Sequence, residues 1–483
     1  MHQAGYGSLN LGTPIMSSIG QRPLRKIPSV EALLRDPEVQ RFAEGIPRKL
    51  LVEAVRASVE ETRRHLLAAA GADADESVLR REILERARRG LQSAMGPHYR
   101  KVINATGIIL HTALGRAVLP ERAIRQIAEQ ASGYSLVQAD VETGARSGRD
   151  ARIQWLLQQL TGAEAATVVN NNAAATALVL NTVANGKEVI VSRGQLIEIG
   201  GAFRLPEVMA ACNAKLVEVG TTNKTHRRDY ERAITDNTAA IMRVHPSNYK
   251  ISGFTSEVSL GDLVAIAHAH HLAVIDDVGA GPLVDVSQFG FEREPTLSVS
   301  VAAGADLITC SADKLIGGCQ GGIILGRAER IQAVRKNPFA RIVRVGKLTL
   351  AALEATLTLF LDPPLALREV PTLRMLRRSL AELTEQAERI ARCVRERAAD
   401  AEVETIGGFS QMGSGSLPTQ NLPTRLVAMR SKSLKPDEIA TRLRHATPSV
   451  FTRIQKDRVL VDPRTILDGE EDTLIKALVE VFS

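Results

Sequence analysis

Short apolar runs alternate with stretches of helical periodicity along the middle of the chain, from about Asn104 to Ala355. Seven runs have the length and apolar character of buried strands, and they span residues 166–169, 188–191, 216–219, 240–244, 272–275, 307–309 and 322–325. Helical patterns such as 173–183 and 260–271 lie between them. This alternation predicts an α/β fold with a mainly parallel sheet covered on both faces. Ligands on such sheets bind at the carboxyl ends of the strands.

The region before this pattern is helical and highly charged. Ser29 can cap a helix that contains Leu33 and Leu34, and apolar residues recur at helical spacing from Leu51 to Val59. Residues 80–89 form a basic helical run, which is either a solvated helix face or a contact surface for RNA phosphates. We expect a flexible leader over residues 1–20 and a small helical domain over residues 21–95.

The region after the pattern predicts a second, smaller domain. Pro363-Pro364 and Pro371 interrupt the helical periodicity. The following segments read as a long amphipathic helix (373–398), a loop rich in Gly, Ser and Pro (407–423), a strand (425–429), a helix (436–444), a hairpin (450–461) and a helix (471–482). We therefore expect an α/β domain over residues 96–360 and an α+β domain over residues 361–483.

The composition narrows the class of protein. Hydrophobic residues at 44% and charged residues at 24% are typical of a globular protein of several domains, given 483 residues. Four scattered cysteines form no disulfide framework, so a reducing cytoplasm is the simplest setting. We find no signal-peptide pattern in residues 1–20 and no apolar run of membrane-spanning length. The net charge of +7 fits either a polyanionic partner or an ordinary basic enzyme surface.

The strongest chemical signal is the apolar run that ends in Ser311-Ala312-Asp313-Lys314 and is followed by a glycine-rich turn. A lysine desolvated at a strand end has a lowered amine pKa, which permits imine formation with an aldehyde. Pyridoxal 5′-phosphate (PLP) bound to Lys314 is the interpretation we favour. A Ser-x-x-Lys hydrolase motif, from Ser311 to Lys314, and a surface lysine without a role are the alternatives.

Two further strand ends fit a PLP site. Asp277 follows an apolar strand, where a carboxylate can pair with a pyridinium nitrogen and keep it protonated. Asn170-Asn171-Asn172 joins a strand to a helix, whose N-terminus can bind a phosphate. Taken alone, each feature also fits an ordinary capped turn.

Arginines in glycine-containing loops form a fourth signal. Arg116 ends the segment 111–116, Arg149 ends the segment 144–149, and Arg344 ends the segment 341–344. Guanidinium groups suit phosphate-like substrates, although loop arginines are often without function. A second group, His268, His270 and His271, lies in a predicted helix without a convincing partner ligand, so we predict no metal site.

In their order along the chain, these segments resemble the family of bacterial selenocysteine synthase, the L-seryl-tRNA(Sec) selenium transferases. The resemblance covers nearly the whole chain beyond the leader and is carried by residues 28–34, 103–107, 114–117, 142–144, 170–173, 197–204, 277–281, 311–314, 347–349 and 459–465. It implies fold type I of the PLP enzymes and a homodecamer with active sites at dimer interfaces. It also implies that the N-terminal domain binds the selenocysteine tRNA.

The resemblance implies a role for each candidate residue. Lys314 would carry PLP as a Schiff base, and Asp277 would pair with the pyridinium nitrogen. The residues around the cofactor phosphate would be Asn171, Asn172 and Ser311. The residues for catalysis or selenophosphate binding would be Asp313, Arg116, Arg149 and Arg344.

Four positions depart from the pattern expected of this family. Ala113 stands in place of asparagine, Gln195 in place of glutamate, Gly346 in place of aspartate, and Cys319 in place of proline. Lys314 and Asp277 are retained, so the departures bear on substrate detail more than on reaction class.

The expected reaction converts seryl-tRNA(Sec) to selenocysteinyl-tRNA(Sec), with selenophosphate as donor. Lys314 would take the Cα proton, Asp313 would assist the loss of the β-hydroxyl, and selenium would add to the resulting dehydroalanyl group. One alternative is a PLP-dependent lyase that acts on a free amino acid or amino sugar acid without tRNA. Another is a tRNA-binding protein with a vestigial PLP fold.

Overall fold

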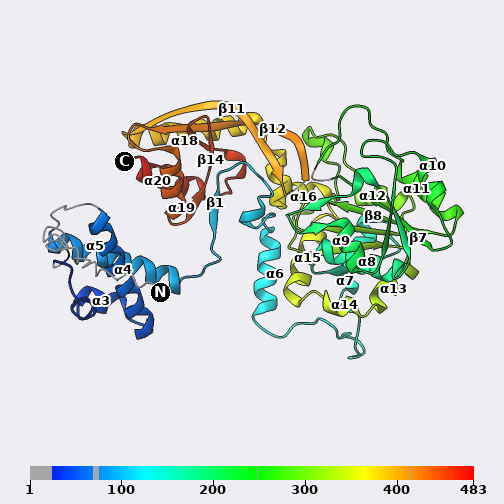
Figure 1. The fold of residues 1–483 in the computed structure, drawn as a ribbon, viewed down its shortest axis with the longest axis horizontal. Coiled ribbons are helices and arrows are strands. Elements are labelled where there is room, and N and C mark those ends of the chain that lie inside the picture. Colours follow the sequence, from blue (N-terminus) through cyan, green and yellow to red (C-terminus); the bar gives the residue numbers. More distant parts are fainter. Residues whose placement is uncertain (1–23, 25, 69–74, 247–248, 415) are drawn as a thin grey trace, which may run out of the picture. The chain divides into compact units, whose positions relative to one another are not determined.

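The computed structural model describes residue 24 and residues 26–68, 75–246, 249–414 and 416–483 (Figure 1). The predicted leader, 1–20, lies outside the described residues. The chain forms two compact units, Met1–Lys101 and Val102–Ser483. Within the described ranges, no helix is long and apolar enough to cross a membrane. The four cysteines are free thiols.

The first unit is helical where it is described. Its helices are α2 (Val30–Leu34), α3 (Pro37–Phe42), α4 (Arg48–Ala68) and α5 (Glu76–Met95). The Ser29 hydroxyl accepts a hydrogen bond from the Ala32 amide, which confirms the predicted cap. Val55 of α4 and Ile83 of α5 are fully buried in the apolar core of this unit.

The second unit contains a seven-stranded sheet, in the order β2-β10-β9-β8-β7-β3-β6. Its strands are β2 (Ala165–Val169), β3 (Glu188–Ser192), β6 (Lys215–Val219), β7 (Thr238–Val244), β8 (Ala273–Gly279), β9 (Leu307–Ser311) and β10 (Gly322–Gly326). All seven predicted strands are confirmed. The pairs among β6, β3, β7, β8 and β9 are parallel, and β10 is antiparallel to both of its neighbours.

Helices cover both faces of this sheet because its buried side chains alternate along each strand (Figure 1). In β7, Ala240 and Met242 belong to one apolar cluster and Ile241 to the other. The first cluster includes residues of α8 (Asn172–Ala184), α9 (Leu205–Ala211) and α13 (Ala328–Lys336). The second includes residues of α7 (Ala151–Thr161), α11 (Leu260–Ala269), α12 (Leu297–Ala302) and α15 (Lys347–Leu359).

Shorter elements complete this part of the unit. They are η1 (Thr112–Leu114), α6 (Glu121–Ala131), η2 (Arg193–Gln195), β4 (Glu198–Ile199), β5 (Phe203–Arg204), α10 (Arg227–Ala233), η3 (Val286–Phe289), α14 (Phe339–Ile342), α16 (Pro363–Glu369) and α17 (Pro371–Arg377). Pro363 and Pro371 open helices rather than ending the helical pattern, because the first helical position needs no N–H donor.

The C-terminal part forms a four-stranded antiparallel sheet, in the order β11-β12-β15-β14, packed with helices. Its elements are α18 (Leu380–Arg397), β11 (Ala401–Gly413), β12 (Ser416–Ser431), α19 (Pro436–His445), β13 (Ser449–Phe451), β14 (Arg453–Gln455), β15 (Arg458–Val461), η4 (Pro463–Thr465) and α20 (Glu471–Phe482). Strand β1 (Val102–Asn104) pairs in parallel with β13, so the start of this unit is anchored on its C-terminal part.

Two sequence predictions in this region were wrong. The expected loop at residues 407–423 is the end of β11 and the start of β12, paired in register from Ala401↔Ser431 to Gln411↔Asn421. Met412, Leu417 and Leu422 near the hairpin end are buried in the core of the large sheet, which outweighs the local Gly, Ser and Pro signal. The expected helix 373–398 is two helices, because Ser379 forms a capping box with Glu382 and starts α18.

Candidate active site

A cavity of about 670 Å³ opens at the carboxyl ends of the central strands. Its walls come from the end of β2 and the start of α8, from the ends of β7 and β8, and from the turn after β9. The loop around η1 and the hairpin of β4 and β5 contribute the remaining walls. Seven of the predicted site residues line it: Arg116, Asn171, Asn172, Asp277, Ser311, Asp313 and Lys314.

Lys314 lies in the turn that follows β9 and is only 5% exposed. Burial is the main cause that lowers the pKa of its amine, and the positive charge of Arg116 adds to it. Asp277, Asp313 and Cys310 act in the opposite direction. A buried amine with a lowered pKa is available as a nucleophile and as a base.

Asp277 is a buried carboxylate in β8, held by donors on a neighbouring helix. Asn172 Nδ2 donates to Asp277 Oδ1 at 2.9 Å, and Thr176 Oγ1 donates to Asp277 Oδ2 at 3.1 Å. The Gly279 amide donates to Oδ1 at 3.2 Å. Burial raises the pKa of Asp277, while these hydrogen bonds and Lys314 oppose the rise. A cationic partner in the cavity would favour the ionised form.

The N-terminus of α8 faces the same cavity through Asn171, Asn172 and Ala173. Asn171 caps this helix, because its Oδ1 accepts a hydrogen bond from the Ala174 amide at 2.8 Å. Both asparagines are expected beside a phosphate, whereas the Asn172 side chain donates to Asp277. Ser311, at the end of β9, is buried at the cavity wall. Helix N–H groups and a hydroxyl are suitable partners for a phosphate.

Arg116 and Asp313 form an ion pair beside Lys314. Arg116 Nη1 lies 2.8 Å from Asp313 Oδ2. Arg116 follows η1 and adopts a positive φ of 63°, a conformation that non-glycine residues rarely adopt. The guanidinium and the carboxylate of this pair line the same cavity as Lys314.

Arg149 and Arg344 lie elsewhere, in a second cavity of about 260 Å³. Five arginines contribute to its lining: Arg146, Arg149, Arg335, Arg341 and Arg344. Arg149 donates to Gln138 Oε1 at 2.8 Å and to the Val345 carbonyl at 3.2 Å. Burial lowers the pKa of Arg149, and Arg344, Arg146 and Arg341 lower it further. Among the described residues, the cavity lined by these arginines and the Lys314 cavity have no lining residue in common.

Several residues of the first cavity were not predicted from the sequence. Thr176 holds the second oxygen of Asp277, and its position four residues after Asn172 on one helix face could have indicated this. His245, after β7, lines the cavity, and burial together with Arg243 lowers its pKa to about 4. Ile197 and Phe203, from the hairpin region, supply apolar wall.

The four unusual residues have distinct environments. Gln195 is buried, and its Oε1 accepts a hydrogen bond from the Val244 amide at 3.1 Å. Cys319 lines the Lys314 cavity. Gly346 precedes α15 as its N-cap, and Ala113 is exposed within η1.

The residues present fit PLP. The buried carboxylate of Asp277 can pair with a ring nitrogen, and Lys314 can bind an aldehyde. The N-terminus of α8 and Ser311 can bind a phosphate. Asn172 Oδ1 is buried without a hydrogen-bond partner in the described chain, which leaves an acceptor free at this site.

Comparisons with known proteins agree with this arrangement. The sequence profile of the family described as L-seryl-tRNA selenium transferase matches residues 102–467, and the profile described as selenocysteine synthase N terminal matches residues 24–63. A solved structure of D-glucosaminate-6-phosphate ammonia-lyase superposes with a TM-score of 0.55 at 22% identity, over 81% of this chain and 97% of that one. This likeness is one of fold alone, and it agrees with the predicted α/β class.

Curated relatives match over nearly their full length. The protein named L-seryl-tRNA(Sec) selenium transferase from Alkaliphilus metalliredigens (strain QYMF) is 44% identical over 95% of this chain and 98% of its own length. The protein of the same name from Desulfomicrobium baculatum is 46% identical over 92% of this chain and 96% of its own. This chain therefore belongs to the L-seryl-tRNA selenium transferase family.

Proposed function

We propose that this protein is a PLP-dependent L-seryl-tRNA(Sec) selenium transferase that acts in the cytoplasm with selenophosphate as donor. The observation that carries the proposal is the full-length match to relatives of that name, in a chain whose buried Lys314 and Asp277 line one cavity. The lyase alternative is not favoured by these relatives, which are named as tRNA-dependent transferases.

The chain's own residues can perform the first half of the reaction. Lys314 is the residue that would hold PLP, and Asp277, Asn171 and Ser311 would bind its ring nitrogen and phosphate. When bound, PLP withdraws electrons from the Cα of the seryl group. The Lys314 amine, with its pKa lowered by burial, is then a suitable base for the Cα proton. The β-hydroxyl would leave as water with the proton that Lys314 has taken from Cα, while the Asp313 carboxylate, paired with Arg116, would orient the hydroxyl.

The arginine-lined cavity is the proposed site of the phosphate-bearing donor. Burial lowers the pKa of Arg149, the positive charges of Arg344, Arg146 and Arg341 lower it further, and a bound dianion would relieve this repulsion. A selenium nucleophile delivered from there must reach the seryl Cβ beside Lys314. Because the two cavities are separate within one chain, we propose that a second subunit brings them together in a homodecamer.

The first unit is the proposed tRNA-binding domain, over residues 21–95. The basic run divides into two sets. Arg80 donates to Asp36 and Arg86 donates to Thr62, so these arginines hold the helices together. Arg81, Arg88 and Arg89 are exposed on α5 and available for RNA phosphates.

The direct test supplies purified protein, loaded with PLP, with seryl-tRNA(Sec) and selenophosphate, and identifies the amino acid hydrolysed from the tRNA. Selenocysteine is the expected product. Unchanged serine, with intact tRNA and donor, would contradict the transferase assignment. Omission of selenophosphate and the Lys314→Ala variant are the matched controls. Neither should give selenocysteine, and Lys314→Ala should leave serine unchanged.

The role of a second subunit has its own test. Chains carrying Lys314→Ala and chains carrying Arg149→Ala are unfolded together, refolded and assayed. If the arginine cavity acts on the Lys314 site of another subunit, mixed oligomers regain activity that neither variant has alone. Failure of mixed oligomers to regain activity would place both cavities on the same chain during catalysis. Sedimentation of the wild-type protein measures the oligomer size.

A further inference from the structure

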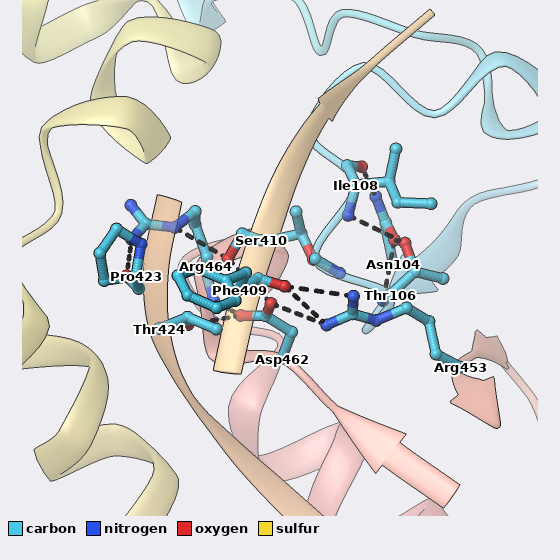
Figure 2. Close-up of polar contacts among 12 residues, drawn as sticks. Asn104, Thr106, Ile108, Phe409, Ser410, Pro423, Thr424, Arg453, Asp462 and Arg464 are labelled. Atoms are coloured by element: carbon cyan, nitrogen blue, oxygen red, sulfur yellow. Dashed lines mark hydrogen bonds and ion pairs between the residues drawn. The ribbon is translucent and has the colours of Figure 1, made fainter. Parts of the chain in front are cut away.

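A buried polar centre in the C-terminal part surrounds Asp462, which is 0% exposed. Ser410 Oγ donates to Asp462 Oδ2 at 2.8 Å, and Thr424 Oγ1 donates to Oδ1 at 2.9 Å. Arg453 Nη2 lies 3.3 Å from Oδ2 (Figure 2). The carboxylate thus connects β11, β12 and β14. Its removal would leave buried partners without hydrogen bonds, which would lower the stability of the fold.

Arg464 links this polar centre to helix α17, which precedes the C-terminal sheet in the sequence. Its Nε donates to Ser410 Oγ at 3.0 Å, and its Nη2 donates to the Pro423 carbonyl at 2.7 Å (Figure 2). Its Nη1 donates to the Met375 carbonyl of α17 at 2.9 Å. Burial lowers the pKa of Arg464 to about 10, so the guanidinium stays charged near neutral pH. These contacts fix β11, β12 and α17 against one another.

The same centre contacts the loop that leaves β1. The Asp462 amide donates to the Ala105 carbonyl at 3.0 Å, and the Gly107 amide donates to Thr465 Oγ1 at 3.0 Å. Gly107 has a φ of +72°, and a Cβ at this position would overlap the Asp462 carboxylate. Only glycine lets the loop approach Asp462 this closely.

The loop then follows β11 to the active site. The Gln411 amide donates to the Gly107 carbonyl at 2.9 Å, the Ile109 amide to the Gln411 carbonyl at 3.0 Å, and the Leu110 amide to the Met412 carbonyl at 2.7 Å. Beyond Leu110 the chain enters η1, and the Arg116 amide donates to the His111 carbonyl at 3.0 Å. Few residues separate the Asp462 centre from Arg116, and hydrogen bonds hold most of them.

We propose that Asp462, Arg464 and Thr465 are positioning residues, which set where the Arg116 guanidinium stands against Asp313 and Lys314. A shift of the loop by about 1 Å is enough to misplace a catalytic group. The C-terminal part is thereby a component of the active site, although none of these three residues lines its cavity. The proposal rests on the proposed function only in requiring that PLP binds at Lys314.

The test uses Thr465, where a single hydrogen bond can be removed with little change of shape. Thr465→Val removes the acceptor of the Gly107 amide, and Thr465→Ser keeps it. The full-length chain is loaded with PLP, and the absorption of the bound cofactor is titrated with pH. The charged groups that act on the pKa of Lys314 are Arg116, Asp277 and Asp313, and the buried Cys310 thiol lies among them.

Arg116→Gln defines the reference shift. Loss of this positive charge should raise the titration midpoint by roughly 1 pH unit, because a nearby like charge disfavours protonation at Lys314. We expect Thr465→Val to shift the midpoint in the same direction by a smaller amount, and Thr465→Ser to keep the wild-type midpoint. Asp462→Asn should shift it as Thr465→Val does, if the protein folds.

A thermal melt of each variant separates positioning from a loss of stability. Gly469→Ala serves as a control, because Gly469 has a φ of +80° with nothing within 4 Å, so the substitution strains the backbone without touching the centre. It should lower the melting temperature and leave the midpoint unchanged. If Thr465→Val melts at a lower temperature but titrates as wild type, or if Arg116→Gln does not shift the midpoint, the positioning role is overturned. A wild-type chain that binds no PLP would instead overturn the proposed function.

Discussion

The two cavities of the second unit differ in how their charges are balanced. Around Lys314, each carboxylate has its own partners: Asp277 accepts hydrogen bonds from Asn172 and Thr176, and Asp313 pairs with Arg116. Around Arg149, positive charge predominates. Burial is the main cause that lowers the pKa of that guanidinium, Arg344, Arg146 and Arg341 lower it further, and Asp150 opposes them. The first arrangement tunes an amine and an acid, whereas the second attracts an anion.

This difference suggests that the two cavities serve different steps of the reaction. A buried amine next to a buried carboxylate suits proton transfer and covalent binding of a cofactor. A group of arginines with few anionic partners suits a phosphate that enters and leaves. We therefore expect substitutions in the first cavity to affect the chemical step, and substitutions in the second to affect the use of donor.

The largest effect is expected from Lys314→Ala. Loss of the base and of the covalent attachment should lower turnover by at least about 10³-fold. Affinity for seryl-tRNA(Sec), measured by filter binding, should stay within about twofold of wild type, because Lys314 is buried and so offers little charge to RNA phosphates. Normal turnover by this variant would remove Lys314 from the mechanism.

A smaller and different effect is expected from Arg149→Ala and Arg344→Ala. Each should raise the KM for selenophosphate by about 10- to 100-fold, as the loss of one or two charged hydrogen bonds predicts. The absorption spectrum of bound PLP should not change, because neither residue lines the Lys314 cavity. A changed spectrum with an unchanged KM would reverse the roles of the two cavities. Arg335→Ala is the control. It should raise the KM for selenophosphate less, because Arg335 already pairs with Asp150 at 3.0 Å.

Thr176→Val should produce a still smaller effect, confined to the first cavity. It removes one hydrogen bond to Asp277 Oδ2 at 3.1 Å while nearly preserving side-chain volume. A loss of about 1 kcal/mol predicts PLP affinity weakened by about fivefold, measured by equilibrium dialysis. Thr176→Ser keeps the hydroxyl and should retain most of the affinity. Equal losses in both variants would show that packing, rather than the hydrogen bond, is responsible.

The mildest test is the pH dependence of stability of the chain without PLP. The pKa of Asp277 is raised in the folded protein, so its contribution to stability is present at low pH and is lost as the pH rises through that pKa. Asp277→Asn removes this titration. The melting temperature of the variant relative to wild type should therefore increase as the pH rises above about 4, the ordinary carboxyl value. A constant difference between pH 4 and pH 8 would contradict the raised pKa.

Much of the fold could be predicted because its signals are local. The seven strands of the large sheet are short apolar runs, and the helices at residues 172–184 and 471–482 carry their periodicity in the sequence. The hairpin of β11 and β12 was missed for the opposite reason. Its Gly, Ser and Pro residues favour a loop, and only burial of Met412, Leu417 and Leu422 against a distant core makes the strands form.

By itself, the sequence determined the α/β class, the family resemblance and the strand ends that carry Lys314, Asp277 and the asparagines. Tertiary structure alone decided that Asn172 and Thr176 hold Asp277, about a hundred residues away. It also separated Arg149 and Arg344 from Arg116, and brought the Asp462 centre to the loop at Gly107. The physical reason is the range of each signal. Periodicity and turn chemistry report on neighbours along the chain, whereas charge pairing and hydrogen bonding depend on which distant segments the fold packs together.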